Sequence, residues 1–223
     1  MPLEARIAAT PSRPLPEGFL PSNCAYSAQD WPVLARQWFP VCCAADALAK
    51  PRQVLLLSLR LVVYRLPDGI RVGRDMCPHR GLTLSSGRVE AEDLVCAYHG
   101  LRFGPDGQCR KVPDKLASKT VDCYRITLFP AVVCQGLVWT CLIPDGEHGR
   151  PGIALDPEDR ERDDPSASAR LSDQAFIASL RFSSPDRRAA AEPFDNPSLQ
   201  DLALAEYRRL LDEMGSGSAQ DAV

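Results

Sequence analysis

The chain has 223 residues, of which 45% are hydrophobic and 25% charged, as in an ordinary globular protein of one or two domains. A formal net charge of −3 gives no basic surplus, so we expect no nucleic-acid partner. No apolar run reaches the length of a signal peptide or a transmembrane helix, so we expect a cytoplasmic protein with no membrane partner. In that reducing compartment most of the nine cysteines are expected to be buried thiols rather than disulfides.

The first half of the chain begins with an arm and continues into strands. Residues 1–30 are rich in proline and small residues and are predicted to be a loose N-terminal arm, with ordered structure from Trp31. Residues 53–65 are dense in leucine and valine, which favours a strand, and the turn signal at 67–69 makes it one arm of a hairpin.

Further strands are predicted downstream, at 124–129 and 136–143 around a turn at Pro130, and residues 104–107 form another turn signal. Many short strands separated by glycine and proline turns are typical of an antiparallel all-β domain, either a sandwich or a barrel. We place this domain at residues 31–146.

The composition changes after Gly146. Residues 147–197 are highly charged and are predicted to be a linker or disordered, and 215–223 a disordered tail. Between them, 198–214 is predicted to be one amphipathic helix, either the remnant of a longer C-terminal helix or a docking helix for a partner. Its apolar face comprises Leu199, Leu202, Ala203, Tyr207, Leu210, Leu211 and Met214.

Two short loops carry the chemistry of the chain. Each offers one thiolate and one imidazole, with sixteen residues between His79 and Cys96: the loops are Cys77-Pro-His79-Arg-Gly and Cys96-Ala-Tyr-His99-Gly. Two cysteines and two histidines suit a [2Fe–2S] cluster in which the cysteines bind one iron and the histidines the other. The alternative is a structural zinc site, although zinc more often pairs cysteine with cysteine and histidine with histidine in each short motif.

The sequence around these loops resembles the Rieske domain of ring-hydroxylating and O-demethylating Rieske non-haem iron oxygenase α-subunits, from Trp31 to Ile143. The matching segments are CPHRG, LTLSSGRVEAEDLVC, CAYHGLRFGPDGQC and GLVW, and the variant YHGL resembles the vanillate-demethylase-like branch. The resemblance implies a Rieske-type β fold with a two-loop cluster-binding subdomain. It also implies one [2Fe–2S] cluster, bound by Cys77 and Cys96 at one iron and by His79 and His99 at the other.

The resemblance also separates this domain from the cytochrome-bc type of Rieske protein. That type has an extra cysteine in each loop, joined in a disulfide, where this chain has Leu82 and Tyr98. Leu101 replaces a serine whose hydroxyl bonds a cluster sulfur in that type. Because fewer hydrogen bonds stabilise the reduced cluster less, we expect a potential in the lower part of the range of about −150 to +300 mV.

The oxygenases of this family have a second domain with a mononuclear iron held by two histidines and one carboxylate. Only His148 remains outside the two loops, and the 77 residues after Gly146 are few and polar. We therefore expect no mononuclear iron and no catalytic residue in this chain. By resemblance it is an oxidoreductase of the Rieske oxygenase class, although not a self-sufficient oxygenase.

Three functions follow from these expectations. The first is one-electron transfer in the oxidation of aromatic compounds, from a reductase or ferredoxin to a catalytic iron on a separate subunit. The second is a truncated oxygenase α-subunit, inactive alone, and the third a zinc-stabilised binding or assembly module. A basic rim that steers an acidic electron donor would consist of Arg80, Arg88, Arg102, Arg110 and Lys111.

Overall fold

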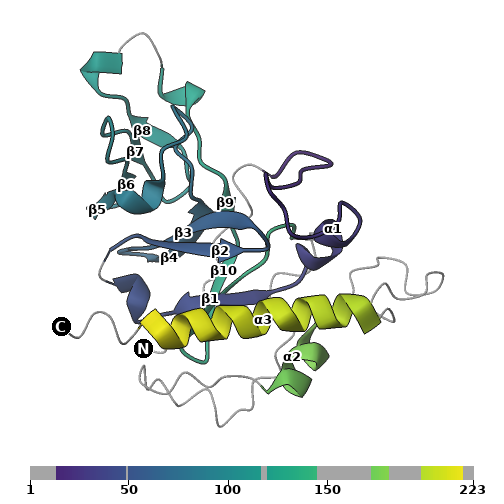
Figure 1. Cartoon of the computed structure of the whole chain (residues 1–223). Coiled ribbons are helices and arrows are strands. Elements are labelled where there is room, and N and C mark those ends of the chain that lie inside the picture. The colour runs from purple at the N-terminus through teal and green to yellow at the C-terminus, as the bar shows by residue number, and fades with distance from the viewer. Residues whose placement is uncertain (1–13, 49, 117–119, 145–171, 181–196, 218–223) are drawn as a thin grey trace.

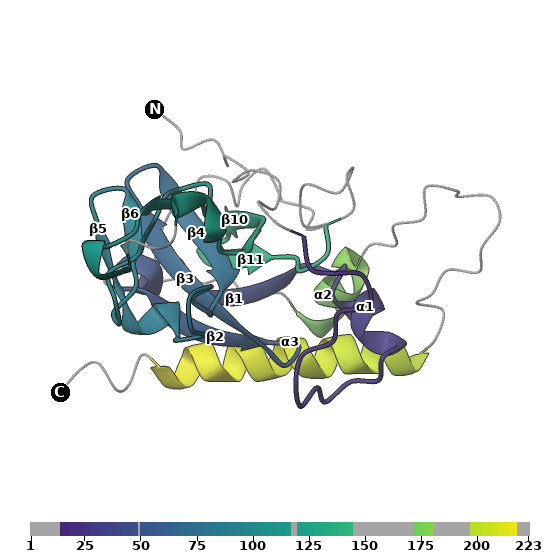
Figure 2. The ribbon, with the colours of Figure 1, turned by 90° about the horizontal axis from the view of Figure 1, so that it is seen from above.

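The computed structural model describes residues 14–48, 50–116, 120–144, 172–180 and 197–217. It has three small antiparallel sheets and few helices, which confirms the predicted all-β fold with a C-terminal helix. Figure 1 shows the sheets stacked, with the sheet of β5–β8 at one end, that of β2, β3, β4 and β9 in the middle, and β1 with helix α3 at the other end. Figure 2 shows the same arrangement from above.

The middle sheet has the strand order β2-β3-β4-β9. Its strands are β2 (Arg52–Leu56), β3 (Leu59–Leu66), β4 (Gly69–Arg74) and β9 (Leu128–Phe129). The predicted turn at 67–69 joins β3 to β4, where Leu66 pairs with Gly69. This sheet separates the two hydrophobic cores of the described residues.

Strand β3 contributes to both cores because successive side chains on a strand point to opposite faces. Leu61 and Val63 belong to the larger core, whereas Val62, Tyr64 and Leu66 belong to the smaller one. All five are at most 1% exposed. A strand buried on both faces reads as a continuous apolar run, which is why this segment shows no alternation in sequence.

The single strand predicted at 53–65 is in fact a hairpin of β2 and β3. Leu57 and Ser58 form its turn in the left-handed region, with φ of +47° and +65°. Neither residue is typical of such a turn, which usually takes asparagine, aspartate or glycine. Tertiary contacts hold it: Trp31 Nε1 donates to the Leu57 carbonyl at 2.8 Å, and the Leu57 N–H donates to Glu206 Oε1 at 2.7 Å.

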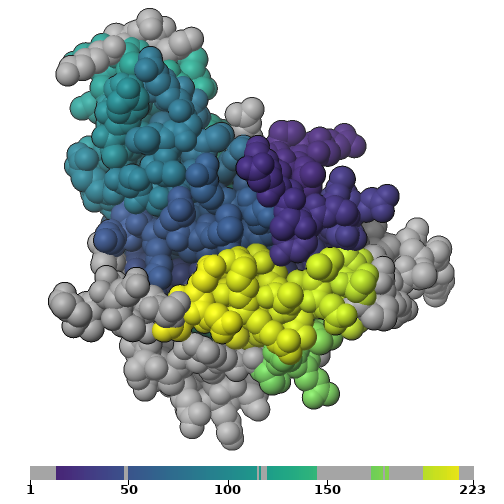
Figure 3. All heavy atoms as spheres, in the orientation of Figure 1, coloured from purple at the N-terminus to yellow at the C-terminus, as the bar shows by residue number. Residues whose placement is uncertain are grey.

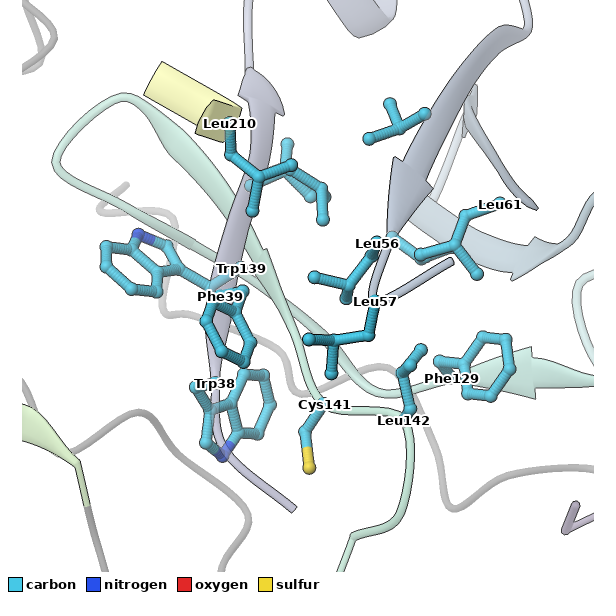
Figure 4. Close-up of a cluster of buried hydrophobic side chains, with 14 of the residues drawn as sticks. Trp38, Phe39, Leu56, Leu57, Leu61, Phe129, Trp139, Cys141, Leu142 and Leu210 are labelled. Carbon is cyan, nitrogen blue, oxygen red and sulfur yellow. The ribbon is translucent and has the colours of Figure 1, made fainter. Parts of the chain in front are cut away.

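The second sheet has the order β1-β11-β10 and covers one face of the middle sheet. Residues 124–129, predicted as one strand, form regular strand only at 128–129, and a further strand follows Pro130. The strands are β1 (Phe39–Cys43), β10 (Ala131–Cys134) and β11 (Leu137–Thr140). Figure 4 shows Phe39 and Trp139 from this sheet close to Leu56 and Leu61 from the middle sheet and Leu210 from α3.

The third sheet, with the order β5-β6-β7-β8, packs on the other face of the middle sheet through the smaller core. Its strands are β5 (Arg88–Glu90), β6 (Asp93–Val95), β7 (Arg102–Phe103) and β8 (Cys109–Lys111). The predicted turn at 104–107 joins β7 to β8. Four 3₁₀ helices connect the strands: η1 (Asp46–Leu48), η2 (Leu84–Ser86), η3 (Asp114–Leu116) and η4 (Val121–Cys123).

The part of the predicted N-terminal arm that the structure describes, 14–30, is packed rather than loose. Phe19 lies edge-on to Trp31 of α1 (Asp30–Leu34), with ring centroids 5.7 Å apart. The hydroxyl of Tyr26 donates to Glu206 Oε2 at 2.9 Å. Figure 3 shows this N-terminal segment against helix α3 on the surface.

The C-terminal helix α3 (Pro197–Gly217) packs on its own domain. Of the seven residues predicted on its apolar face, six are buried and Leu202 is half-buried. A second helix, α2 (Asp173–Ser179), lies within the predicted linker and stacks Phe176 on Tyr207 at 4.0 Å between ring centroids. Helix α3 includes residues 215–217, which were predicted to belong to the disordered tail. Residues 147–171, 181–196 and 218–223 lie outside the described residues. No described helix combines the length and apolarity required to cross a membrane.

Candidate metal centre

The first loop, residues 77–82, lies between β4 and η2 and is closed by two backbone hydrogen bonds. The Cys77 N–H donates to the Leu82 carbonyl at 2.7 Å, and the Gly81 N–H donates to the Cys77 carbonyl at 2.8 Å. Gly81 has a φ of +75°, a conformation that side chains disfavour, which accounts for glycine at this position.

The second loop, residues 96–101, lies between β6 and β7 and repeats this backbone. The Cys96 N–H donates to the Leu101 carbonyl at 2.9 Å, and the Gly100 N–H donates to the Cys96 carbonyl at 3.0 Å. Gly100 has a φ of +74°. Two segments with the same hydrogen bonds and the same turn therefore present a cysteine each.

Each cysteine sulfur is also surrounded by backbone donors of its own loop. The N–H groups of His79 and Arg80 bond the sulfur of Cys77, and those of Tyr98 and His99 bond the sulfur of Cys96. Such donors stabilise negative charge on sulfur, as in a metal-bound thiolate.

The two thiols contact each other, and both residues are 2% exposed. The hydrogen bond between them lowers the pKa of Cys96 to about 6 and raises the pKa of Cys77, because one proton is shared between two sulfurs. The contact between the two sulfurs thus favours loss of a proton from Cys96, the form in which a cysteine binds a metal.

The two imidazoles also face each other. His79 Nδ1 and His99 Nδ1 are 3.1 Å apart, and both residues are half-buried. Partial removal from water lowers the pKa of His79, with a smaller contribution from the positive charges of His99 and Arg80. A histidine with a lowered pKa is neutral at pH 7 and has a lone pair available for a metal.

The cysteine pair and the histidine pair do not converge on one point. In the described part of the chain, no three histidine, cysteine or acidic side chains are placed to hold one metal ion. A structural zinc ion requires four ligands around a single centre. Two separate pairs instead match two irons with two protein ligands each, so the residues present fit a [2Fe–2S] cluster with mixed ligands.

A comparison with known families matches residues 37–125 to the Rieske [2Fe-2S] domain. These residues form a Rieske domain. Its cofactor is a [2Fe–2S] cluster, and the predicted resemblance is confirmed.

Curated relatives match about half of this chain or less. The 3-chlorobenzoate-3,4-dioxygenase oxygenase subunit of Comamonas testosteroni is 33% identical over 111 residues, which are 48% of this chain and 26% of that protein. The vanillate O-demethylase oxygenase subunit of Pseudomonas sp. (strain HR199 / DSM 7063) is 36% identical over 77 residues, which are 34% of this chain and 22% of that protein. The match thus spans about a quarter of each relative.

A solved structure is similar over the same region. The crystal structure of dicamba monooxygenase bound to dicamba matches with a TM-score of 0.50 and 30% identity, over 57% of this chain and 38% of that one. All three proteins are oxygenases or oxygenase subunits by name and extend well beyond the matched region.

Aromatic rings lie against both imidazoles of the Rieske domain. The Tyr98 ring covers His99, with centroids 3.8 Å apart, and the Tyr124 ring is edge-on to His79 at 5.8 Å. Tyr98 is 54% exposed, so the imidazole pair lies near the surface, whereas the thiol pair lies inside. Sequence reasoning did not identify Tyr124, because it lies 25 residues after His99 and belongs to no motif.

The basic rim predicted around the loops is largely neutralised. Three of its five members form ion pairs on the third sheet: Arg88 with Glu90, Arg102 with Glu90 and Asp93, and Arg110 with Glu92 and Asp93. Arg80 and Lys111 are exposed and pair with no described acidic residue. A steering surface would therefore depend on Arg80 and Lys111 and not on Arg102.

The other cysteines are mostly core residues, as predicted. All nine cysteines lie in the described residues and none forms a disulfide. Of the seven outside the loops, four are buried, Cys24 and Cys43 pack against the larger core, and Cys123 is exposed. His148 lies outside the described residues.

Proposed function

We propose that this chain is a Rieske electron-transfer protein of an aromatic-compound oxygenase system. It accepts single electrons from a reductase or ferredoxin and passes them to a mononuclear iron on another chain. The observation that carries this proposal is the pair of matched loops in a Rieske domain, which bring two thiols together and, separately, two imidazoles.

In this proposal Cys77 and Cys96 bind one iron, and His79 and His99 bind the other through their facing Nδ1 atoms. When bound, the cluster supplies one-electron redox chemistry. The chain's own contribution is to orient the four ligands and to keep water from the sulfur end, where both cysteines are buried. The half-buried histidines and the exposed Tyr98 mark the end at which electrons enter and leave.

The kind of partner is supported by the relatives. Two of them are oxygenase subunits by name, which implies further components in their systems. Of the three histidines in the 223 residues, two are assigned to the cluster, and a site of two histidines and a carboxylate needs two more. These residues alone therefore do not supply such a site, and the proposal assigns the acceptor iron to another chain and the cluster to a domain at residues 31–146.

The proposal is tested with purified protein, a flavin-dependent reductase and NADH under anaerobic conditions. We expect about two irons and two sulfides per chain, with the cluster bleached by one electron per chain and reoxidised by an added electron acceptor. Oxygen uptake with aromatic methyl ethers should stay at background when this chain and the reductase are the only proteins present. Zinc in place of iron and sulfide would instead support the assembly-module alternative.

A further inference from the structure

The two cluster loops share a backbone but differ in how their ends are held. The second loop is the connection of a β-hairpin: β6 ends at Val95, β7 begins at Arg102, and these two residues pair directly. Strand pairing therefore fixes the two ends of the second loop against each other.

The first loop has no such hairpin. Before it, β4 pairs with β3 and β9; after it come η2 and then β5, which pairs with β6. The strands that flank the first loop, β4 and β5, belong to different sheets and do not pair with each other. Direct pairing of the flanking strands therefore does not fix the ends of this loop.

Asp75 and Ser85 connect the two ends of the first loop. Asp75 is 2% exposed and lies two residues before Cys77, and Ser85 lies three residues after Leu82. The Ser85 N–H donates to Asp75 Oδ1 at 2.8 Å, and the Ser85 hydroxyl donates to Asp75 Oδ2 at 2.7 Å. One carboxylate thus receives two hydrogen bonds from the far end of the loop.

The same carboxylate is anchored to the middle sheet. Gln53 Nε2 on β2 donates to Asp75 Oδ2 at 2.6 Å, and the Asp75 N–H donates to the Arg60 carbonyl on β3 at 2.9 Å. Hydrogen bonds to an ionised acceptor are stronger than those between neutral groups, and they offset the cost of burying a carboxylate. Both ends of the loop are therefore fixed to one rigid sheet.

We propose that Asp75 and Ser85 are positioning residues for the cluster. The hydrogen bonds between these two side chains fix the ends of the first loop, as the β6–β7 pairing fixes the ends of the second loop. They thereby set the position of Cys77 and His79 relative to Cys96 and His99. This inference rests on the proposed function, because it requires the two loops to hold the cluster.

The test compares Ser85→Ala with the neighbouring variant Ser86→Ala in the holoprotein. The first removes the hydroxyl bond to Asp75, whereas the second removes an exposed hydroxyl that contacts only Thr83 Oγ1, at 2.7 Å. The readouts are the rate of iron release to a chelator and the EPR spectrum of the reduced cluster. Neither readout requires oxygenase activity.

We expect iron release from Ser85→Ala to be about tenfold faster than from wild type, the ratio that corresponds to one lost hydrogen bond to a charged acceptor. The EPR g-values should shift as well, because the first-loop ligands move. Ser86→Ala should match wild type in both readouts, and Ser85→Thr, which keeps a hydroxyl, should restore them. Asp75→Asn replaces one hydrogen-bond acceptor with a donor. It should therefore release iron faster than Ser85→Ala does.

The proposal that Asp75 and Ser85 position the cluster is overturned if Ser85→Ala and Ser86→Ala release iron at the same rate and give the same EPR spectrum. It is also overturned if Ser85→Ala only lowers the melting temperature while the EPR spectrum stays unchanged, since that outcome is a general loss of stability. If Asp75→Asn does not fold, the Ser85 variants decide. A wild-type chain without iron and sulfide would contradict the proposed function instead, so the two failures are distinguishable.

Discussion

Cys96 and Cys109 show how the surroundings of a thiol decide its role. Both are buried in the smaller core, on either side of β7 in sequence. Backbone groups bond both sulfurs, but the sulfur of Cys96 also faces a second thiol and lies in a tight loop, whereas Cys109 lies in strand β8 and faces no second thiol among the described residues. Only the first environment suits a metal-bound thiolate.

We therefore predict that Cys96→Ala abolishes the cluster and that Cys109→Ala keeps it. The two variants remove the same atom from the same core, so their packing losses are comparable. The measurement is iron and acid-labile sulfide per chain, with the visible spectrum of each variant. Retention of both elements by Cys96→Ala, or their loss from both variants, would contradict this assignment.

The thiols outside the loops should differ in reactivity according to burial. Burial raises the pKa of Cys42 to about 12, and Cys42 is 1% exposed, whereas Cys123 is exposed. Because the thiolate is the nucleophile, iodoacetamide at pH 8 should label Cys123 within minutes and leave Cys42 unmodified in the folded protein. Mass spectrometry of peptides measures the labelling of each cysteine, and in urea both Cys42 and Cys123 should react. Equal labelling of the two in the folded protein would contradict the burial of Cys42.

At the residue scale, motif spacing singles out the four candidate ligands, and the structure brings the two cysteines together and the two histidines together. Motif spacing was not sufficient for the hydrogen bonds between Asp75 and Ser85, because a side chain bonded across a ten-residue loop leaves no periodic or compositional signal. Tyr124 was missed for the same reason. Candidate ligands that occur in a short motif can be recognised from a sequence. Residues that position those ligands through contacts between distant segments cannot.

At the scale of elements, the β2–β3 turn shows tertiary contacts overriding local preference. Leu57 and Ser58 carry no turn signal, and their left-handed conformation is held by Trp31 and Glu206, which lie far away in sequence. Helix α3 was predictable because its apolar face repeats with the helical period. The packing of that face against β1 and α2 was not, because it depends on which surface the middle and second sheets leave open.

Glu206 links α3 to the rest of the domain. It is 4% exposed and accepts hydrogen bonds from Tyr26, Leu57 and Arg209. We predict that Glu206→Ala lowers the free energy of unfolding by about 3 kcal/mol, because the buried Leu57 N–H loses its acceptor and Tyr26 and Arg209 each lose hydrogen bonds to this carboxylate. Urea denaturation measures this change.

The matched control is Glu213→Ala, which removes the other carboxylate on Arg209. Glu213 has a side chain that is 55% exposed, so its loss should change the free energy of unfolding by no more than about 0.5 kcal/mol. Equal effects of the two variants would contradict the proposal that Glu206 fixes α3 to the β2–β3 turn.

The ion pairs of the third sheet should make its stability depend on pH. Hydrogen bonds from Arg88 and then from Arg102 lower the pKa of Glu90. A lowered pKa in the folded state means that this carboxylate stabilises the fold above its ordinary pKa, and that the stabilisation is lost as pH falls through the lowered value. The stability difference between wild type and Glu90→Gln should therefore be largest near pH 7 and become steadily smaller as pH falls below the ordinary pKa of a glutamate.

Glu92→Gln is the control for that pH series. Glu92 is 66% exposed and has one 3.5 Å contact with Arg110, so its substitution should change stability little at any pH. Chemical denaturation of the apo-protein from pH 7 to pH 3 measures both variants without interference from cluster loss. A constant difference for Glu90→Gln across this range would contradict the role assigned to its charge.

At the scale of the whole molecule, the middle sheet joins two parts with different tasks. One face of this sheet forms the larger core with the second sheet, the N-terminal segment and helices α1, α2 and α3. The other face supports the third sheet and the two loops. Because β3 is buried on both faces, the position of the cluster loops depends on the whole fold. The apolar face of α3 is covered within the chain by β1 and α2.

The central claim is a [2Fe–2S] cluster with two thiolate and two imidazole ligands. The most direct test is pulsed EPR of the dithionite-reduced protein, with iron and sulfide measured on the same sample. We predict about two irons and two sulfides per chain, and hyperfine coupling to two imidazole nitrogens. Replacing either His79 or His99 by cysteine should remove one of these two couplings. A reduced cluster without nitrogen coupling, or a protein that contains zinc and no sulfide, would contradict it.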